Sequence, residues 1–204
     1  ELGIENEEVK NGIHTVVGLG GQFLKGKKTL HLGNAGTATR FLTAVMTLRK
    51  SPTVITGNTR MQQRPIDDLV NALRQLGADI KYLKTKNCPP LLIKNFKFKN
   101  FKISVKGNKS SQYISALLMM APLLPKPLTI KVIGELTSRP YVDVTLSVMK
   151  AFGVTVQNED YKTLVIKPQA YKACRFKIEG DASAASYWHS INFLQGGHLR
   201  FTNL

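Results

Sequence analysis

Cysteine is scarce in this sequence, and clusters of metal-binding side chains are missing. Of the 204 residues only two are cysteine, Cys88 and Cys174, which lie far apart and form no CxxC pair. Such usage fits a reducing compartment and gives no ground for a disulfide. The four histidines stand singly, without HxxxH or His/Cys spacing, so we predict no metal site.

Long hydrophobic runs are missing as well. The longest, within residues 114–124, is too short to span a bilayer and contains Ser115 and Pro122. The first residues show no pattern of a secretory signal. Hydrophobic residues still make up 43% of the chain, which is enough to bury a core in one large or two small domains. We therefore expect a globular protein without a membrane-spanning helix.

Acidic residues are few. Against 29 lysines and arginines stand 13 aspartates and glutamates, which gives a net charge of +16. A nucleic acid, an anionic membrane surface or a small polyanionic substrate would suit this charge, and so would acidic residues in the remainder of a longer protein.

Residues 94–106 alternate Phe96, Phe98 and Phe101 with lysines. This is typical of a stacking platform for nucleic acid, and also of strands with one buried face.

What the sequence does contain is a glycine-rich turn followed by a helical pattern. Gly33, Asn34 and Gly36 follow a short apolar stretch, and apolar residues then recur with helical spacing from Ala38. We predict a helix to about residue 49, with Asn34 as its N-cap and Arg40 one turn into it. A helix start offers free amides to anions, and Gly36 lets a ligand approach the backbone.

The same design recurs along the chain. Gly107 lies 74 positions after Gly33, Arg139 lies 75 after Arg64, and Gly180 lies 73 after Gly107. This period is longer than those of the common solenoid repeats. It indicates a layered α/β module used two or three times.

Each copy is predicted to hold a strand, a turn, a helix, a strand, a loop, a helix and two strands. In the first copy we expect strands at 30–32, 53–56, 78–83 and 91–94, and a second helix that starts at Pro65. In the second copy we expect strands at 101–105, 128–133, 154–156 and 164–166, and a second helix that starts at Pro140. A third copy is expected to begin with a strand at 176–178, a helix at 182–194 and a strand at 198–202. The predicted fold class is therefore α/β, with repeated βαβαββ units packed around a pseudo-threefold axis.

The polar residues at the helix starts favour anion binding. They offer hydroxyls, amides and guanidinium groups and include no cysteine, histidine or acid pair: Asn34, Gly36, Thr37, Arg60, Arg64, Ser110, Ser111, Gln112, Ser138 and Arg139. Such groups suit phosphates and carboxylates, and an arginine contacts either in a bidentate way. The plainer roles are N-capping for Ser110 and Ser111 and a surface position for Arg64.

Five stretches carry a resemblance to a known family. Residues 32–40 (LGNAGTATR), 56–65 (TGNTRMQQRP), 107–113 (GNKSSQY), 138–143 (SRPYVD) and 179–187 (EGDASAASY) resemble successive motifs of the 5-enolpyruvylshikimate-3-phosphate (EPSP) synthase family, in that family's order. The resemblance implies an inverted α/β prism lobe. It also implies a cytoplasmic enzyme, a 3-phosphoshikimate 1-carboxyvinyltransferase of the shikimate pathway for aromatic amino acid biosynthesis.

The resemblance implies a reaction between two small anions. The enolpyruvyl group of phosphoenolpyruvate moves to the 5-hydroxyl of shikimate 3-phosphate, and phosphate is released. No cofactor, metal, nucleic acid or membrane is implied. Glyphosate is implied as an inhibitor that uses the space at Gly36, although Phe41 stands where the family commonly has proline.

The resemblance also assigns residues to the two substrates. It places Asn34, Gly36, Arg64 and Gln112 at phosphoenolpyruvate, with Thr37 and Arg40 supporting that loop. It places Ser110, Ser111, Gln112, Ser138 and Tyr141 at shikimate 3-phosphate. No catalytic residue is expected within this chain, because the family's catalytic Asp, Glu and Lys belong to a second lobe.

The resemblance predicts a division of the chain at residue 179. Residues 1–178 are expected to form most of the first lobe, and residues 179–204 the crossover and the first elements of the second lobe, which would complete the site as a partner. Little or no activity is expected of this chain alone. Two alternatives remain from the residues themselves: a basic α/β module that binds RNA or another polyanion through the 94–106 region, and a scaffold fragment that binds no ligand.

Overall fold

The computed structural model describes residues 4–9, 13–94, 96–201 and 204. The chain divides into two compact units, Glu1–Lys172 and Ala173–Leu204. This division into compact units does not test the boundary between two lobes expected at residue 179, which stays a prediction.

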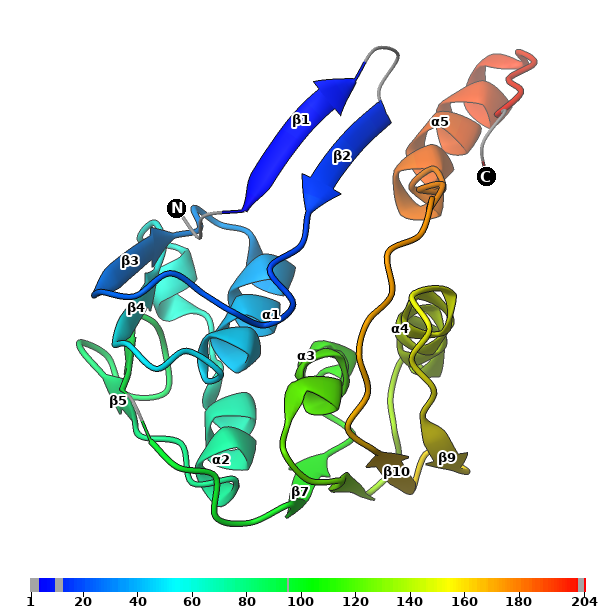
Figure 1. Cartoon of the computed structure of the whole chain (residues 1–204). Coiled ribbons are helices and arrows are strands. Elements are labelled where there is room, and N and C mark those ends of the chain that lie inside the picture. Colours follow the sequence, from blue (N-terminus) through cyan, green and yellow to red (C-terminus); the bar gives the residue numbers. More distant parts are fainter. Residues whose placement is uncertain (1–3, 10–12, 95, 202–203) are drawn as a thin grey trace. The chain divides into compact units, whose positions relative to one another are not determined.

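The larger unit contains the predicted repeat twice (Figure 1). The first copy consists of β3 (Lys28–His31), α1 (Gly36–Met46), β4 (Thr53–Thr56), α2 (Asp67–Gln75), β5 (Ile80–Tyr82) and β6 (Leu91–Ile93). The second copy consists of β7 (Lys102–Lys106), α3 (Ser111–Met120), β8 (Leu128–Ile133), α4 (Arg139–Ala151), β9 (Gln157–Glu159) and β10 (Thr163–Ile166). Short 3₁₀ helices lie at Met61–Gln63 and Ala121–Leu123, and β1 (Glu5–Val9) pairs with β2 (Ile13–Val17) in an antiparallel hairpin.

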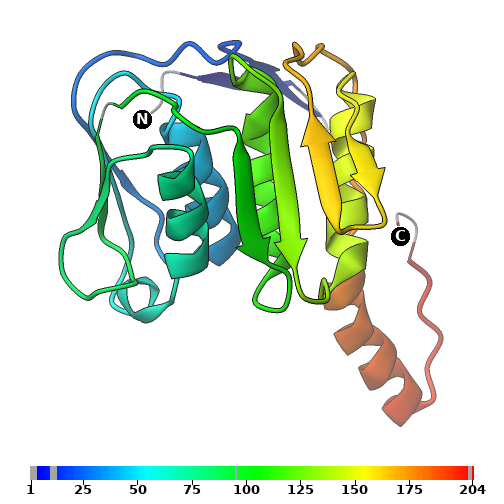
Figure 2. The same cartoon turned by 90° about the horizontal axis from the view of Figure 1, so that it is seen from below.

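The two copies have the same sheet topology. The strand orders are β3-β4-β6-β5 and β7-β8-β10-β9, and the second sheet is seen in Figure 2. In both sheets the first two strands are parallel and the other neighbours antiparallel. A helix therefore links the parallel pair in each copy, as parallel strands require, and the predicted βαβαββ unit is confirmed.

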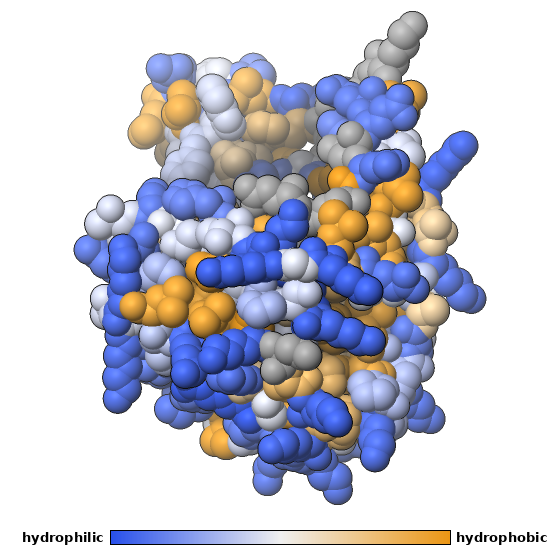
Figure 3. Space-filling model, turned by 60° about the vertical axis from the view of Figure 1, so that its left-hand side comes forward, coloured by the Kyte–Doolittle hydropathy of each residue, from blue (hydrophilic) through white to orange (hydrophobic). Residues whose placement is uncertain are grey.

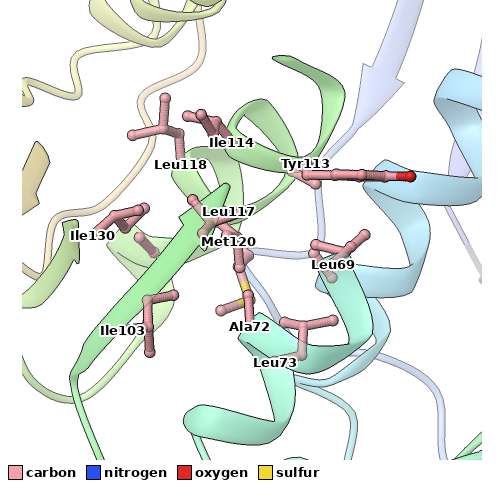
Figure 4. Packing of buried hydrophobic residues seen from close by; sticks show 14 of the residues in the cluster. Leu69, Ala72, Leu73, Ile103, Tyr113, Ile114, Leu117, Leu118, Met120 and Ile130 are labelled. Carbon is pink, nitrogen blue, oxygen red and sulfur yellow. The ribbon is translucent and has the colours of Figure 1, made fainter. Parts of the chain in front are cut away.

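One hydrophobic core joins the two copies. Helix α3 packs against α1 and α4 and is buried along nearly its whole length. Figure 4 shows Leu69 and Leu73 of α2 facing the same interior as Leu117 of α3 and Ile103 of β7. The apolar spacing read from the sequence places these side chains inward, and their burial supplies most of the driving force for folding.

A glutamine joins α2 to the edge of the second sheet. The Gln75 carboxamide oxygen accepts from the Ser104 amide at 2.8 Å, and its nitrogen donates to the Ser104 carbonyl at 2.9 Å. The side chain thus pairs with β7 as a neighbouring strand would, and it satisfies backbone groups on an edge strand.

Two predicted helix starts are wrong. Helix α1 begins at Gly36 with Ala35 at its N-cap, because the Ala35 amide donates to the Leu32 carbonyl in a turn that leaves Asn34 outside the helix. Helix α2 begins at Asp67 rather than at Pro65. The Pro65 carbonyl is held outside the helix by donors from other segments.

Three predicted strands are also wrong. Residues 154–156 form no strand, because the Thr155 amide donates to the Gln169 side chain, and β9 begins at Gln157 instead. Residues 176–178 and 198–201 form no strand either. Thr202, the last residue of the strand expected at 198–202, lies outside the described residues.

The smaller unit consists mainly of α5 (Ala182–Gln195), close to the helix predicted at 182–194. The Asp181 carboxylate caps it by accepting from the Ser183 and Ala184 amides, and Gly196 ends it in the left-handed conformation. Aromatic side chains on this helix are exposed, including Tyr187, Trp188 and Phe193.

A half-buried tyrosine predicts a loss of stability at alkaline pH. The Tyr171 hydroxyl donates to the Met119 carbonyl at 2.9 Å, and burial raises the pKa of Tyr171 from about 10 to about 12. Because a phenol is charged only after it loses its proton, the folded state resists deprotonation while the unfolded chain does not. The stabilising contribution is therefore full below pH 10 and is lost as the pH rises toward 12.

We expect the free energy of unfolding of the wild-type chain to fall between pH 9 and pH 11 by about 1 kcal/mol more than that of Tyr171→Phe. Urea unfolding at both pH values measures this difference. Tyr187→Phe, at an exposed position, should keep the wild-type slope. Equal slopes for wild type and Tyr171→Phe would contradict the prediction.

Candidate functional site

The helix starts of the two copies meet. Gln112, the second residue of α3, donates from its side-chain nitrogen to the Thr37 hydroxyl at 3.0 Å. Thr37 is the second residue of α1, so the bond joins equivalent positions of the repeat. Two helix N-termini thus open side by side, each with the positive end of a helix dipole.

The guanidinium of Arg64 lies against Gly36. A Cβ atom added to Gly36 would come within 2.6–2.8 Å of three guanidinium atoms, and Arg64 Nη1 lies 3.4 Å from the Asn34 carbonyl. The structure therefore brings Asn34, Gly36 and Arg64 together. Arg64 comes from the loop after β4 and is partly exposed, so N–H groups at the edge of its guanidinium can donate to an anion.

A second arginine lies beneath this loop. Arg40 is only 6% exposed, and it donates to the carbonyls of Gly36 at 2.9 Å and Pro65 at 3.0 Å. The Tyr113 hydroxyl donates to the same Pro65 carbonyl at 3.1 Å. These bonds tie the start of α1 to the loop that carries Arg64. Tyr113 was not among the predicted site residues.

Arg40 also contributes positive charge. Burial lowers the pKa of the Arg40 guanidinium, and the nearby Arg64 cation lowers it further, yet an arginine keeps its proton in proteins. Among the described residues, no carboxylate forms an ion pair with Arg40. The charge at this helix start is thus left for an anionic ligand.

The two serines at the start of α3 have different roles. The Ser110 hydroxyl accepts from the Gln112 amide at 3.3 Å and caps the helix, so the plainer role expected for it is present. Its hydrogen remains able to donate to a ligand. Ser111 is 7% exposed and faces a hollow that Tyr141 also lines.

The remaining predicted residues lie at the start of α4. Ser138 is the N-cap, in the left-handed conformation at φ 57°, and Tyr141 is 63% exposed. Tyr141 shares the hollow with Ser111, Gln112 and Thr37, and its amide donates to the Ser138 carbonyl at 3.1 Å.

Two hollows meet at Gln112. One, of about 520 Å³, has a charged lining that includes Arg40, Arg64, Lys106, Lys109, Asp67 and Asp68. The other, of about 650 Å³, is mainly apolar and includes Phe41, Val45, Met119 and Val148. Anions fit the first hollow, where basic side chains outnumber acidic ones. Lys106 and Lys109 were not predicted as site residues; the polar turn at 107–112 was the only signal near them.

The 94–106 region does not present its phenylalanines as a stacking platform. Phe96, Phe98 and Phe101 are half-buried against the core, and the Phe96 and Phe98 rings pack edge to face at 5.0 Å. On the face shown in Figure 3, hydrophilic side chains are spread among hydrophobic areas rather than gathered in one band. Among the described residues, no helix has the length and hydropathy of a membrane span.

Gly36→Ala should weaken anion binding without unfolding the protein. The added methyl would displace the Arg64 guanidinium, which is the far end of a flexible side chain, so the backbone need not move. We expect binding of a phosphate anion to weaken about 10-fold, as for the loss of one charge-assisted contact, with thermal stability nearly unchanged. Calorimetric titration measures the first and thermal unfolding the second. Undiminished binding would show that the position of the Arg64 guanidinium does not affect anion binding.

Comparison with known proteins points in one direction. The sequence model of one family, described as "EPSP synthase (3-phosphoshikimate 1-carboxyvinyltransferase)", matches residues 1–204. A curated relative from Marinomonas sp., named 3-phosphoshikimate 1-carboxyvinyltransferase, is 47% identical over 203 residues, which cover 98% of this chain and 48% of the relative. One of the same name from Shewanella halifaxensis is 46% identical over 197 residues, covering 95% of this chain and 46% of the relative.

The fold has a solved counterpart. A structure of an EPSP synthase from Acinetobacter baumannii matches with a TM-score of 0.77 at 23% identity, covering 92% of this chain and 41% of that one. The chain spans about half the length of the curated relatives it matches. These comparisons give no support to a nucleic-acid-binding module.

Proposed function

Because the chain belongs to the EPSP synthase family, we propose that it forms the substrate-holding part of a 3-phosphoshikimate 1-carboxyvinyltransferase. This enzyme transfers the enolpyruvyl group of phosphoenolpyruvate to the 5-hydroxyl of shikimate 3-phosphate and releases phosphate. The observation that carries the proposal is the Arg64 guanidinium lying against Gly36, beside the pair of helix starts joined by Gln112 and Thr37.

The geometry supports a division of the site between the two substrates. Arg64, with Asn34 and Gly36, would hold the phosphate and carboxylate of phosphoenolpyruvate, because a guanidinium forms bidentate bonds to either group. Arg40 and Thr37 support that loop by the bonds described above. Glyphosate, a small anion, would take the same place.

The hydroxyl-rich residues would hold the second substrate. Ser110, Ser111, Ser138 and Tyr141 would donate to shikimate 3-phosphate, and Gln112, which lines both hollows, would lie between the two ligands. In the reaction, the 5-hydroxyl gives up its proton and adds to C2 of phosphoenolpyruvate while C3 takes a proton, and the tetrahedral adduct then loses phosphate together with a proton from C3. The residues of this chain contribute by orienting the reactants and stabilising negative charge.

The proton transfers need groups from elsewhere. The proposed site in this chain contains no histidine, and its acids Asp67 and Asp68 lie in the first turn of α2, where they compensate the helix dipole. We therefore propose that a second lobe of the same enzyme, in the cytoplasm, supplies the acid and base. The isolated chain should bind substrate without turnover.

Titration with shikimate 3-phosphate tests the proposal. The chain should bind one equivalent saturably at low and moderate salt, and Ser111→Ala should weaken binding about 10-fold through the loss of a hydrogen bond to a charged group. Ser190→Ala, at an exposed position on α5, is the matched control and should bind as wild type does. A folded chain that shows no saturable binding would refute the proposal. Binding whose strength depends only on the salt concentration, as in a polyanion interaction, would refute it as well.

A further inference from the structure

A tyrosine in the hairpin between β9 and β10 contacts the start of α4. The Tyr161 hydroxyl donates to the Asp143 carboxylate, and the Arg139 guanidinium lies over the Tyr161 ring at 5.4 Å from its centroid. Arg139 and Asp143 stand two residues before and two residues after Tyr141. The Tyr161 side chain thus contacts one residue before Tyr141 and one residue after it at the start of α4.

The hairpin adopts an unusual backbone to present this side chain. Asp160 and Tyr161 both have positive φ, at 49° and 54°, a conformation that bulky residues rarely adopt. Backbone groups within the turn are bonded, with the Tyr161 amide donating to Asn158 and the Lys162 amide to the Glu159 carbonyl. Residues held in such conformations persist where surrounding contacts determine them.

The first turn of α4 is held on its other side by α3. The Thr145 hydroxyl donates to the Tyr141 carbonyl at 2.9 Å and lies 2.7 Å from the Ser115 hydroxyl, which is buried. Ser115 lies one turn after Ser111 on α3. Bonds from α3 on one side and from the hairpin on the other therefore fix the direction of Tyr141.

Burial alone would not fix this turn. Only Val142 and Met149 are buried in α4, while Ser138 and Tyr141 face solvent. A residue whose neighbours are exposed keeps its place through specific contacts, and displacement of a binding group by about 1 Å weakens recognition strongly.

We propose that Tyr161 is a positioning residue for shikimate 3-phosphate: through Asp143 and Arg139 it orients the turn that presents Ser138 and Tyr141 to the ligand. This inference rests on the proposed function for the identity of the ligand. The contacts of Tyr161 with Asp143 and Arg139 do not depend on that proposal. Hydrogen bonding to Asp143 raises the pKa of Tyr161, which is consistent with a hydroxyl that keeps its proton for this bond.

Substitutions at both ends of the hydroxyl–carboxylate bond test the proposal. Tyr161→Phe keeps the ring beneath Arg139 and removes only the hydroxyl, and Asp143→Ala removes the acceptor. Each should weaken shikimate 3-phosphate binding about 5-fold, and the double substitution should weaken it no further, because both remove one interaction. Asp143→Asn keeps an acceptor oxygen and should restore most of the affinity. Tyr187→Phe is the control and should bind as wild type does.

A second readout does not need the ligand. Amide hydrogen exchange at residues 141–143 should be several-fold faster in Tyr161→Phe and Asp143→Ala than in wild type, with an unchanged midpoint of thermal unfolding. Unchanged binding and exchange in Tyr161→Phe would overturn the proposal, and so would additive losses in the double variant. If the wild-type chain itself fails to bind, the proposed function and the ligand role fall together, and exchange alone decides whether Tyr161 holds the turn.

Discussion

Replacing Arg40 with alanine should lower the free energy of unfolding by about 3 kcal/mol and abolish the phosphoenolpyruvate binding proposed above. The guanidinium makes two charge-assisted hydrogen bonds, to the Gly36 and Pro65 carbonyls, and bonds to charged groups contribute about 1.5–3 kcal/mol each. Alanine would leave the Gly36 carbonyl without this donor and a cavity at a position that is 6% exposed. Urea unfolding measures the loss, and titration with phosphoenolpyruvate measures the binding.

Two further variants separate charge from geometry. Arg40→Lys keeps the positive charge but has one nitrogen in place of the two that reach different carbonyls, so it should recover only part of the stability. Arg60→Ala, at an exposed position in the same loop region, should change stability by less than about 0.5 kcal/mol. A loss below about 1 kcal/mol for Arg40→Ala would contradict the role described for Arg40.

Gly57→Ala should be about as destabilising, for a steric reason. A Cβ atom at Gly57 would overlap the Gly33 carbonyl oxygen and lie 2.8 Å from Cβ and Cγ of Met61, a fully buried residue. Because the nearest obstacle is backbone, relief requires the two loops to separate, which would break the bond from the Asn58 amide to the Gly33 carbonyl. We expect a loss of about 3 kcal/mol and weaker binding of both substrates, measured by urea unfolding and calorimetry.

The chain offers a matched control for this substitution. Gly18 has an ordinary φ and no atom within 4 Å of an added Cβ, so Gly18→Ala should be neutral or slightly stabilising. Comparison with Gly36→Ala is equally informative, because there the obstacle is the mobile end of Arg64. Gly57→Ala should therefore lower stability where Gly36→Ala lowers only affinity. Equal stability of Gly57→Ala and Gly18→Ala would show that the two loops can separate freely.

Periodic features of the fold could be predicted from the sequence. Helical spacing of apolar residues predicted that the α1 helix exists, but not its buried face: Phe41, Leu42 and Val45 are only half-buried, whereas Thr39, Arg40, Thr43 and Ala44 are buried. The recurrence of Gly33 at Gly107 predicted two equivalent βαβαββ units, which the sheets confirm. These predictions succeed because side-chain periodicity follows the geometry of helix and strand directly. Element boundaries were less certain: the positions of Asn34 and Pro65 followed capping preferences that contacts from other segments override.

By itself, then, the sequence determined the repeat, the family and the set of polar residues at the helix starts. Only the tertiary structure decided which of them meet: Gln112 with Thr37, 75 positions away, and Arg64 with Gly36. It also decided that Tyr161 reaches Asp143, a contact that no local pattern indicated. The physical reason is that such pairs depend on how whole helices pack around α3, and that packing is determined by many weak contacts between residues far apart in the chain.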